Sequence, residues 1–210
     1  MLTISIVSDV VCPWCYVAYK QLRQALDARE LNAAIVWEPF ELNPWMSDQG
    51  QEIQEHLAMK YGPGAASGGG ERMRALGEEL GITFNRPPDM RIYNTLKAHQ
   101  LLHWADGMGK QHALKMALFH AYFTDNRNIS DLSVLTDIAE SVGLDAKEAT
   151  DIANGEAERL AVQDRIEEFA RRGIMVVPTM IFNNKRVVSG AQGVDGYGRL
   201  LDKLTAATPA

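Results

Sequence analysis

The sequence lacks three features that would place it in large classes of protein. It has no basic cluster: 21 Lys and Arg stand against 27 Asp and Glu, and the net charge is −6. No apolar run approaches the roughly 20 residues that a membrane-spanning helix needs. The first apolar run has no basic residues before it and ends at Asp9, so it predicts a strand and not a secretion signal. We therefore expect neither a nucleic-acid partner nor a membrane partner.

Cysteine is also scarce. The 210 residues contain only Cys12 and Cys15, in one Cys-Pro-Trp-Cys motif, so none is left for a framework of structural disulfides. In a cytoplasmic protein such a pair is catalytic or redox-sensing, and we expect a cytoplasmic location. Zinc needs four ligands, and no second Cys-x-x-Cys completes a set. His99 and His103 share a helix face without a third ligand, so we predict no metal and assign both to contacts between helices.

The motif stands where a strand passes into a helix. Apolar residues alternate before it, and residues 16–26 place apolar side chains on one helix face. Pro13 suits the first helical turn, since its missing N–H has no intrahelical partner there. The helix dipole should lower the pKa of Cys12, and Cys15 lies one turn away as a resolving thiol. This combination predicts thiol–disulfide exchange, with half a zinc site or two structural thiols as alternatives.

The rest of the chain predicts an α/β protein with a long interruption. Residues 33–42 predict a second strand, parallel to the first, with Pro39 at a sheet edge or a break. Residues 44–154 predict helices without any strand, and include a flexible loop at 62–70. A long helix is expected over 156–172. Two apolar runs across Asn183-Asn184 then predict a β-hairpin, followed by a last helix to about residue 204.

This order of elements resembles a thioredoxin fold with a large all-helical insertion, as in DsbA-like proteins. Six segments resemble the FrnE subgroup of DsbA-family oxidoreductases: SDVVCPWCY (8–16), FELNP (40–44), NTxxAH (94–99), FxAYF (119–123), NISD (128–131) and SGAQ (189–192). The implied division is a thioredoxin-like domain, 1–43 and 155–210, and an inserted helical domain, 44–154. The family is also similar to 2-hydroxychromene-2-carboxylate isomerases and kappa-class glutathione transferases, which typically have Ser where Cys12 stands.

The resemblance implies a role for each residue of the motif. Cys12 would be the nucleophile and Cys15 the resolving thiol, while Pro13 and Trp14 would tune the pair. Val177-Pro178 would be a cis-proline segment facing the disulfide, and the backbone of Val177 would pair with an extended substrate like an added strand. The implied substrate is a protein or small-molecule disulfide. No bound cofactor is implied; glutathione is a candidate redox partner, and a homodimer is allowed.

The sequence departs from the family pattern at three places. Many relatives carry an acid six residues before the first cysteine, where this chain has Ile6. Water, Glu38 or Glu41 would then accept the proton of the resolving thiol. Met175-Val176 stands where relatives often have Thr-Gly, which would crowd the groove beside the sulfurs. Trp14 adds no positive charge near Cys12, unlike the His of the most oxidising relatives.

Two other functions remain open from the sequence. One is a glutathione-dependent isomerase or transferase of the kappa type, against which Cys12 in place of Ser argues. The other is a non-enzymatic, chaperone-like protein whose apolar insertion holds client chains. The aromatic residues of the insertion are expected to form its core, and part of the set could line a substrate groove over the disulfide: Trp104, Phe119, Tyr122 and Phe123.

Overall fold

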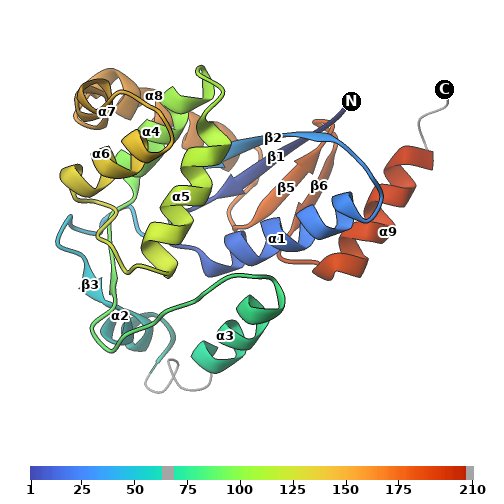
Figure 1. Cartoon of the computed structure of the whole chain (residues 1–210), viewed down its shortest axis with the longest axis horizontal. Coiled ribbons are helices and arrows are strands. Elements are labelled where there is room, and N and C mark those ends of the chain that lie inside the picture. Colours follow the sequence, from blue (N-terminus) through green and yellow to red (C-terminus); the bar gives the residue numbers. More distant parts are fainter. Residues whose placement is uncertain (63–68, 207–210) are drawn as a thin grey trace.

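A mixed four-stranded sheet lies at the centre of the computed structural model, which describes residues 1–62 and 69–206 (Figure 1). The strands run in the order β2-β1-β5-β6. Their bounds are Leu2–Ser8 for β1, Ala33–Pro39 for β2, Thr179–Phe182 for β5 and Arg186–Ser189 for β6. β1 pairs in parallel with β2 and antiparallel with β5. The predicted α/β fold and its parallel first pair are confirmed.

The two parallel strands are joined by α1, Pro13–Asp27, which lies beside the last helix, α9, Gly193–Ala206 (Figure 1). α1 begins where the sequence predicts, with Cys12 at the N-cap and Pro13 in the first helical turn. Pro39 is the last residue of β2, which is an edge strand of this sheet. The edge position predicted from Pro39 is therefore confirmed.

The predicted hairpin is formed by β5 and β6. Asn183 and Asn184 have φ values of 49° and 54°, which asparagine adopts more readily than most residues. The Lys185 N–H donates to the Phe182 carbonyl at 3.0 Å. The side chain of Asn183 also accepts the Thr3 N–H at 3.0 Å, which ties the turn to β1.

The inserted segment contains six of the helices: α2 Ile53–Tyr61, α3 Gly69–Glu79, α4 Leu96–Asp106, α5 Gln111–Phe123, α6 Leu132–Ser141 and α7 Ala146–Ala153. The long helix α8, Glu156–Arg171, follows it. The prediction of an all-helical insertion is wrong in one detail, since β3, Gln51–Glu52, pairs antiparallel with β4, Arg91–Ile92. Strands of two residues are too short to give a periodic pattern. Most of the flexible loop predicted at 62–70 lies outside the described residues.

The insertion and the sheet share one hydrophobic core. The Tyr16 ring of α1 stacks on Phe119 of α5 with 4.7 Å between ring centroids, and Trp37 of β2 meets Phe119 edge-on at 5.9 Å. Tyr19 Oη and His112 Nε2 are hydrogen-bonded at 3.0 Å. The predicted boundaries between the two parts remain a prediction. None of the helices in the described part is both long and apolar enough to span a lipid bilayer.

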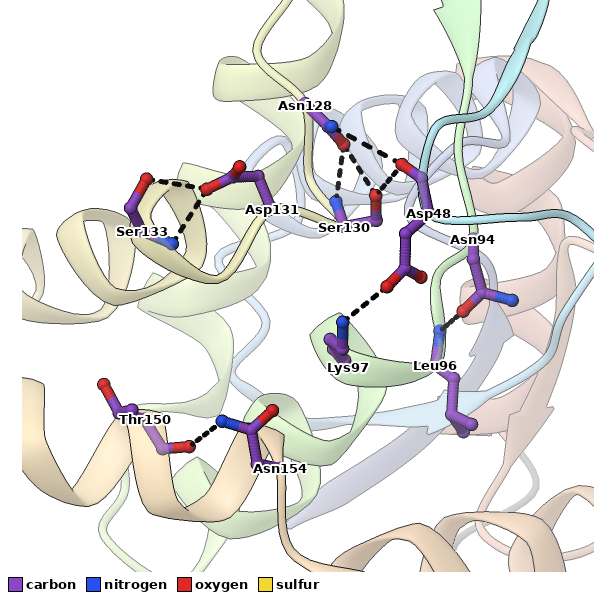
Figure 2. A network of polar contacts seen from close by, with 10 residues as sticks. All are labelled: Asp48, Asn94, Leu96, Lys97, Asn128, Ser130, Asp131, Ser133, Thr150 and Asn154. Atoms are coloured by element: carbon purple, nitrogen blue, oxygen red, sulfur yellow. Dashed lines mark hydrogen bonds and ion pairs between the residues drawn. The ribbon is translucent and has the colours of Figure 1, made fainter.

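A polar network joins the chain before β3 to the beginnings of α4 and α6 (Figure 2). Lys97 of α4 forms an ion pair with Asp48 at 2.7 Å. Ser130 donates its hydroxyl to the Asp48 carbonyl at 2.6 Å, and Asn128 accepts the Ser130 N–H at 3.0 Å. Asp131 caps α6 by accepting the N–H groups of its first turn. The NISD segment singled out in the sequence therefore holds the insertion together.

Candidate active site

Cys12 and Cys15 lie at the beginning of α1, where the chain leaves β1. The Cys12 N–H donates to the Asp9 carbonyl at 3.2 Å, and the Cys15 N–H donates to the Cys12 carbonyl at 3.1 Å. Both thiols are free, and they lie close enough to hydrogen-bond to each other. Cys12 keeps 4% of its surface exposed and Cys15 keeps none, whereas Trp14 between them is 42% exposed. A substrate can therefore reach Cys12 before Cys15.

The pKa of Cys12 differs from the sequence-based expectation. A hydrogen bond with Cys15 is the largest cause that raises it well above its ordinary value, and burial is the next. The charges of the Cys15 thiolate and of Asp9 raise it further, while the Cys15 N–H lowers it. The predicted low pKa is wrong for this dithiol form, because burial and the second thiol outweigh the helix terminus.

The loop before β5 brings the predicted proline segment to the same site. The Val177–Pro178 peptide bond is cis, and the Pro178 carbonyl accepts the Gly190 N–H at 2.8 Å. Pro178 is buried, while Val177 is half-buried and lines a hollow that Cys12, Pro13 and Trp14 also line. Met175 and Val176, expected to crowd this groove, are instead exposed at 66% and 57%.

The hollow over Cys12 has a volume of about 470 Å³ and a largely apolar wall. Tyr122 and Phe123 are part of this wall, as predicted for a portion of the aromatic set, whereas Phe119 lies behind them against Tyr16. Lys60 and Arg86 also line the hollow. Among the described residues no Asp or Glu takes part in the wall, so its charged groups are all cationic.

Two buried charged groups near the cysteines do not line the hollow. Asp9 is fully buried and accepts the Leu42 N–H at 2.7 Å and the His99 ring at 3.3 Å. Lys115 of α5 is fully buried too, and its charge interacts with those of Cys15 and Asp9. In the sequence, Asp9 indicated the end of the first apolar run, and Lys115 was not singled out. The available signal was a lysine on the apolar face of a helix, between Leu114 and Leu118.

The two predicted proton acceptors have different surroundings. Ile6 is fully buried, so no acid lies at the position that many relatives use. The Glu38 carboxylate forms two hydrogen bonds with Arg165, at 2.7 and 2.5 Å, and is held as its ion-pair partner. Glu41 has a pKa raised to about 7, by burial and then by the charge of Asp9. Glu41 is therefore a carboxyl group that can exchange a proton near neutral pH.

The histidines that invited a metal assignment are separated in the structure. His99 is buried against Asp9, whereas His103 is exposed and pairs with Glu158 at 2.6 Å. Within the described ranges, no three His, Cys, Asp or Glu side chains are grouped so that they could hold a metal ion. His103 therefore takes part in a contact between helices, as the sequence predicted, whereas His99 contacts Asp9 in the loop between β1 and α1.

Comparison with known proteins assigns the chain to a family. The model of the DSBA-like thioredoxin domain matches residues 3–202. The uncharacterized protein YwbO of Bacillus subtilis is 29% identical over 202 residues, which are 94% of each chain. A probable DsbA oxidoreductase from Streptomyces coelicolor has 28% identity and a TM-score of 0.92, covering 100% of this chain and 92% of its own.

A more distant neighbour shares the fold. The cytosolic disulfide reductase DsbM from Pseudomonas aeruginosa, solved with GSH, has a TM-score of 0.67 at 18% identity, covering 97% of this chain and 99% of its own. The finer resemblance to the FrnE subgroup stays a prediction. With paired cysteines at the start of α1 and a family match that spans nearly its whole length, the chain belongs to the family of DSBA-like thioredoxin domains.

Proposed function

We propose that the protein is a thiol–disulfide oxidoreductase that acts through a mixed disulfide on Cys12. The observation that carries this proposal is the unequal exposure of the paired thiols: Cys12 borders the hollow, and Cys15 is fully buried behind it. The Cys12 thiolate attacks one sulfur of a substrate disulfide, and the other sulfur leaves as a thiolate. Cys15 then attacks Cys12, which forms the enzyme disulfide and releases the second substrate thiol.

The raised pKa of Cys12 adds a condition to this mechanism. The attacking species is a minor fraction of Cys12 near neutral pH, so the exchange rate should increase as the pH rises. Val177 borders the hollow together with Cys12, and its backbone is the group we assign to pairing with an extended substrate. Pro13 and Trp14 complete the near wall, where they contact the substrate beside the reacting sulfur.

Glutathione is the redox partner that the hollow favours. The carboxylates of glutathione are attracted to the wall of the hollow, where the charged groups are Lys60 and Arg86 and the described residues include no acid. The structure of DsbM from Pseudomonas aeruginosa was solved with GSH, and that protein is a cytosolic reductase. We therefore propose that this chain exchanges disulfides with glutathione in the cytoplasm, with protein or small-molecule disulfides as its other substrates.

Two single variants test the mechanism. Cys12→Ser should abolish disulfide exchange, measured as insulin reduction with a glutathione-based reducing system. Cys15→Ser should retain the first attack and accumulate a mixed disulfide with oxidised glutathione, visible by mass spectrometry. Undiminished activity of Cys12→Ser would overturn the proposal, and so would a stable adduct on Cys15 of that variant.

The cationic hollow also favours a second candidate, a glutathione-dependent isomerase of the kappa type. Such an enzyme binds glutathione without forming a disulfide, so it does not need a resolving thiol. Cys15→Ser should then turn over a chromene substrate with glutathione at the wild-type rate. This candidate would be excluded if the Cys15→Ser protein lost turnover of the chromene substrate, or if the wild-type protein showed no turnover at all.

A further inference from the structure

Lys115 is a fully buried lysine whose ammonium group has no hydrogen-bonding partner among the described residues. Burial of an unpaired charge is costly, and it lowers the pKa of Lys115 to about 8. The nitrogen lies 5.2 Å from the ring centroid of Trp37 and 4.8 Å from that of Phe119. These aromatic faces stabilise a cation in part, but they neutralise no charge.

The position of Lys115 is fixed relative to the sulfurs. His112, Lys115 and Phe119 follow one another along a single face of α5. The two outer members contact α1: His112 hydrogen-bonds Tyr19, and Phe119 stacks on Tyr16. Lys115 therefore lies between two contacts with the first turns of α1, where Cys15 also lies. Of the charges that act on Lys115, that of the Cys15 thiolate is the strongest.

A second cavity, of about 330 Å³, is lined by Lys115 together with other charged side chains and a larger apolar area. It lies among β2, α4, α5 and α8. The titratable and charged groups around Lys115 and its cavity are Cys12, Cys15, Asp9, Glu38, His99, His103, Asp106 and Arg165. Glu38 is paired with Arg165, and His103 with Glu158. Asp9 accepts two hydrogen bonds, whereas the Lys115 ammonium has no hydrogen bond or ion pair within the described part of the chain.

We propose that Lys115 is the buried counter-charge of the Cys15 thiolate, a positioning residue that takes over the task of the acid missing at Ile6. The inference rests on the proposed exchange reaction. In the release step the Cys15 thiol loses its proton to solvent. The Cys15 sulfur then bonds to the Cys12 sulfur, and the bond between Cys12 and the substrate breaks. The substrate sulfur leaves with the electron pair and is protonated by solvent.

The consequence for Lys115 depends on the redox state. In the dithiol form Cys15 can lose its proton, and its thiolate then balances the ammonium. In the disulfide form neither sulfur carries a negative charge, so the ammonium loses its counter-charge and its proton is held less tightly. Reduction of the disulfide is therefore coupled to proton uptake at Lys115.

The first test measures the pKa of Cys15 alone, in a Cys12→Ser background. The thiolate is followed by its ultraviolet absorbance against pH, and the Cys12→Ser/Cys15→Ser protein supplies the tyrosine background to subtract. Adding Lys115→Met should raise the pKa of Cys15 by about one unit or more. Lys115→Arg keeps the charge, so the pKa of Cys15 in that protein should stay close to its value with Lys115. Lys110→Met, which removes an exposed lysine just before α5, is the matched control.

An unchanged pKa of Cys15 in the Lys115→Met protein would overturn the inference. So would an equal rise in the Lys110→Met protein. This measurement needs no exchange activity, so it distinguishes failure of the inference from failure of the proposed function.

A second test uses the unaltered chain, so it does not depend on whether the variants fold. Lysine labelled with ¹³C at the ε position reports the protonation of Lys115 by NMR, in the dithiol form and in the disulfide form. We expect a lower pKa for Lys115 in the disulfide form. Equal values in the two forms would overturn the inference.

Discussion

Glu41, directly after β2, gives a pH-dependent prediction with a definite sign. Burial, and then the charge of Asp9, raise its pKa from 4.5 to about 7, and its Oε1 is buried without a hydrogen-bonding partner among the described residues. A rise of that size corresponds to about 3.4 kcal/mol. Because the group is partly exposed, solvent screening reduces this to about 2 kcal/mol.

The sign follows from the two states of the chain. The unfolded chain loses the Glu41 proton at the ordinary pKa, whereas the folded chain keeps it until about pH 7. Below the ordinary pKa the folded state carries no penalty from Glu41. As the pH rises from 4.5 through 7 the folded state loses stability, until the whole ~2 kcal/mol is lost.

Glu41→Gln removes this titration and should stabilise the protein at alkaline pH only. At about pH 8 the gain of ~2 kcal/mol corresponds to a Tm rise of roughly 4–8 °C for a chain of this size, with almost no change at about pH 4.5. Circular dichroism melts of the reduced protein at both pH values measure it. Glu140→Gln, at an exposed position of α6, is the matched control. A Tm change of equal size at the two pH values would refute the reasoning.

Three further substitutions test the contacts around the site. Phe119→Ala removes the ring stacked on Tyr16 and should lower the free energy of unfolding by about 3–5 kcal/mol in urea titrations; a loss below ~1 kcal/mol would contradict its central place in the core. Arg165→Met leaves the buried Glu38 carboxylate unpaired and should lower the free energy of unfolding by about 2 kcal/mol. An added Glu38→Met should restore most of that stability. No recovery in the double variant would show that another contact was lost. Asn184→Gly should stabilise the β5–β6 turn by roughly 0.5 kcal/mol, because glycine adopts a positive φ without strain, and a lower Tm would speak against this.

The parts of the fold with strong local signals could be predicted from the sequence. Pro39 indicated an edge strand because proline has no N–H to donate to a neighbouring strand. The pair Asn183-Asn184 indicated a hairpin because asparagine tolerates the positive φ that a tight turn needs. β3 and β4 could not be found, since they have two residues each and depend on contact between distant segments. Gly50 permits that contact: it has a φ of +67°, and a Cβ there would lie 2.4 Å from the Ile92 carbonyl.

The candidate site was predictable in its residues but not in its electrostatics. The spacing of Cys12 and Cys15 indicated that the two thiols lie close together, because a helix start brings residues three apart together. Their pKa depends on burial and on Asp9, which are properties of the folded chain. Lys115 lies 100 residues beyond Cys15 in the sequence, and only the contact of α5 with α1 brings the two together.

The core that Tyr16, Trp37 and Phe119 build between the insertion and the sheet limits how the insertion of this chain could be exchanged. Their rings fit one another, so an insertion transplanted onto a different thioredoxin scaffold would arrive without the aromatic partners of α1 and β2. A working chimera would have to transfer Tyr16 and Trp37 along with the helices. Recombination at residues 43 and 154 alone should yield chains that fail to assemble.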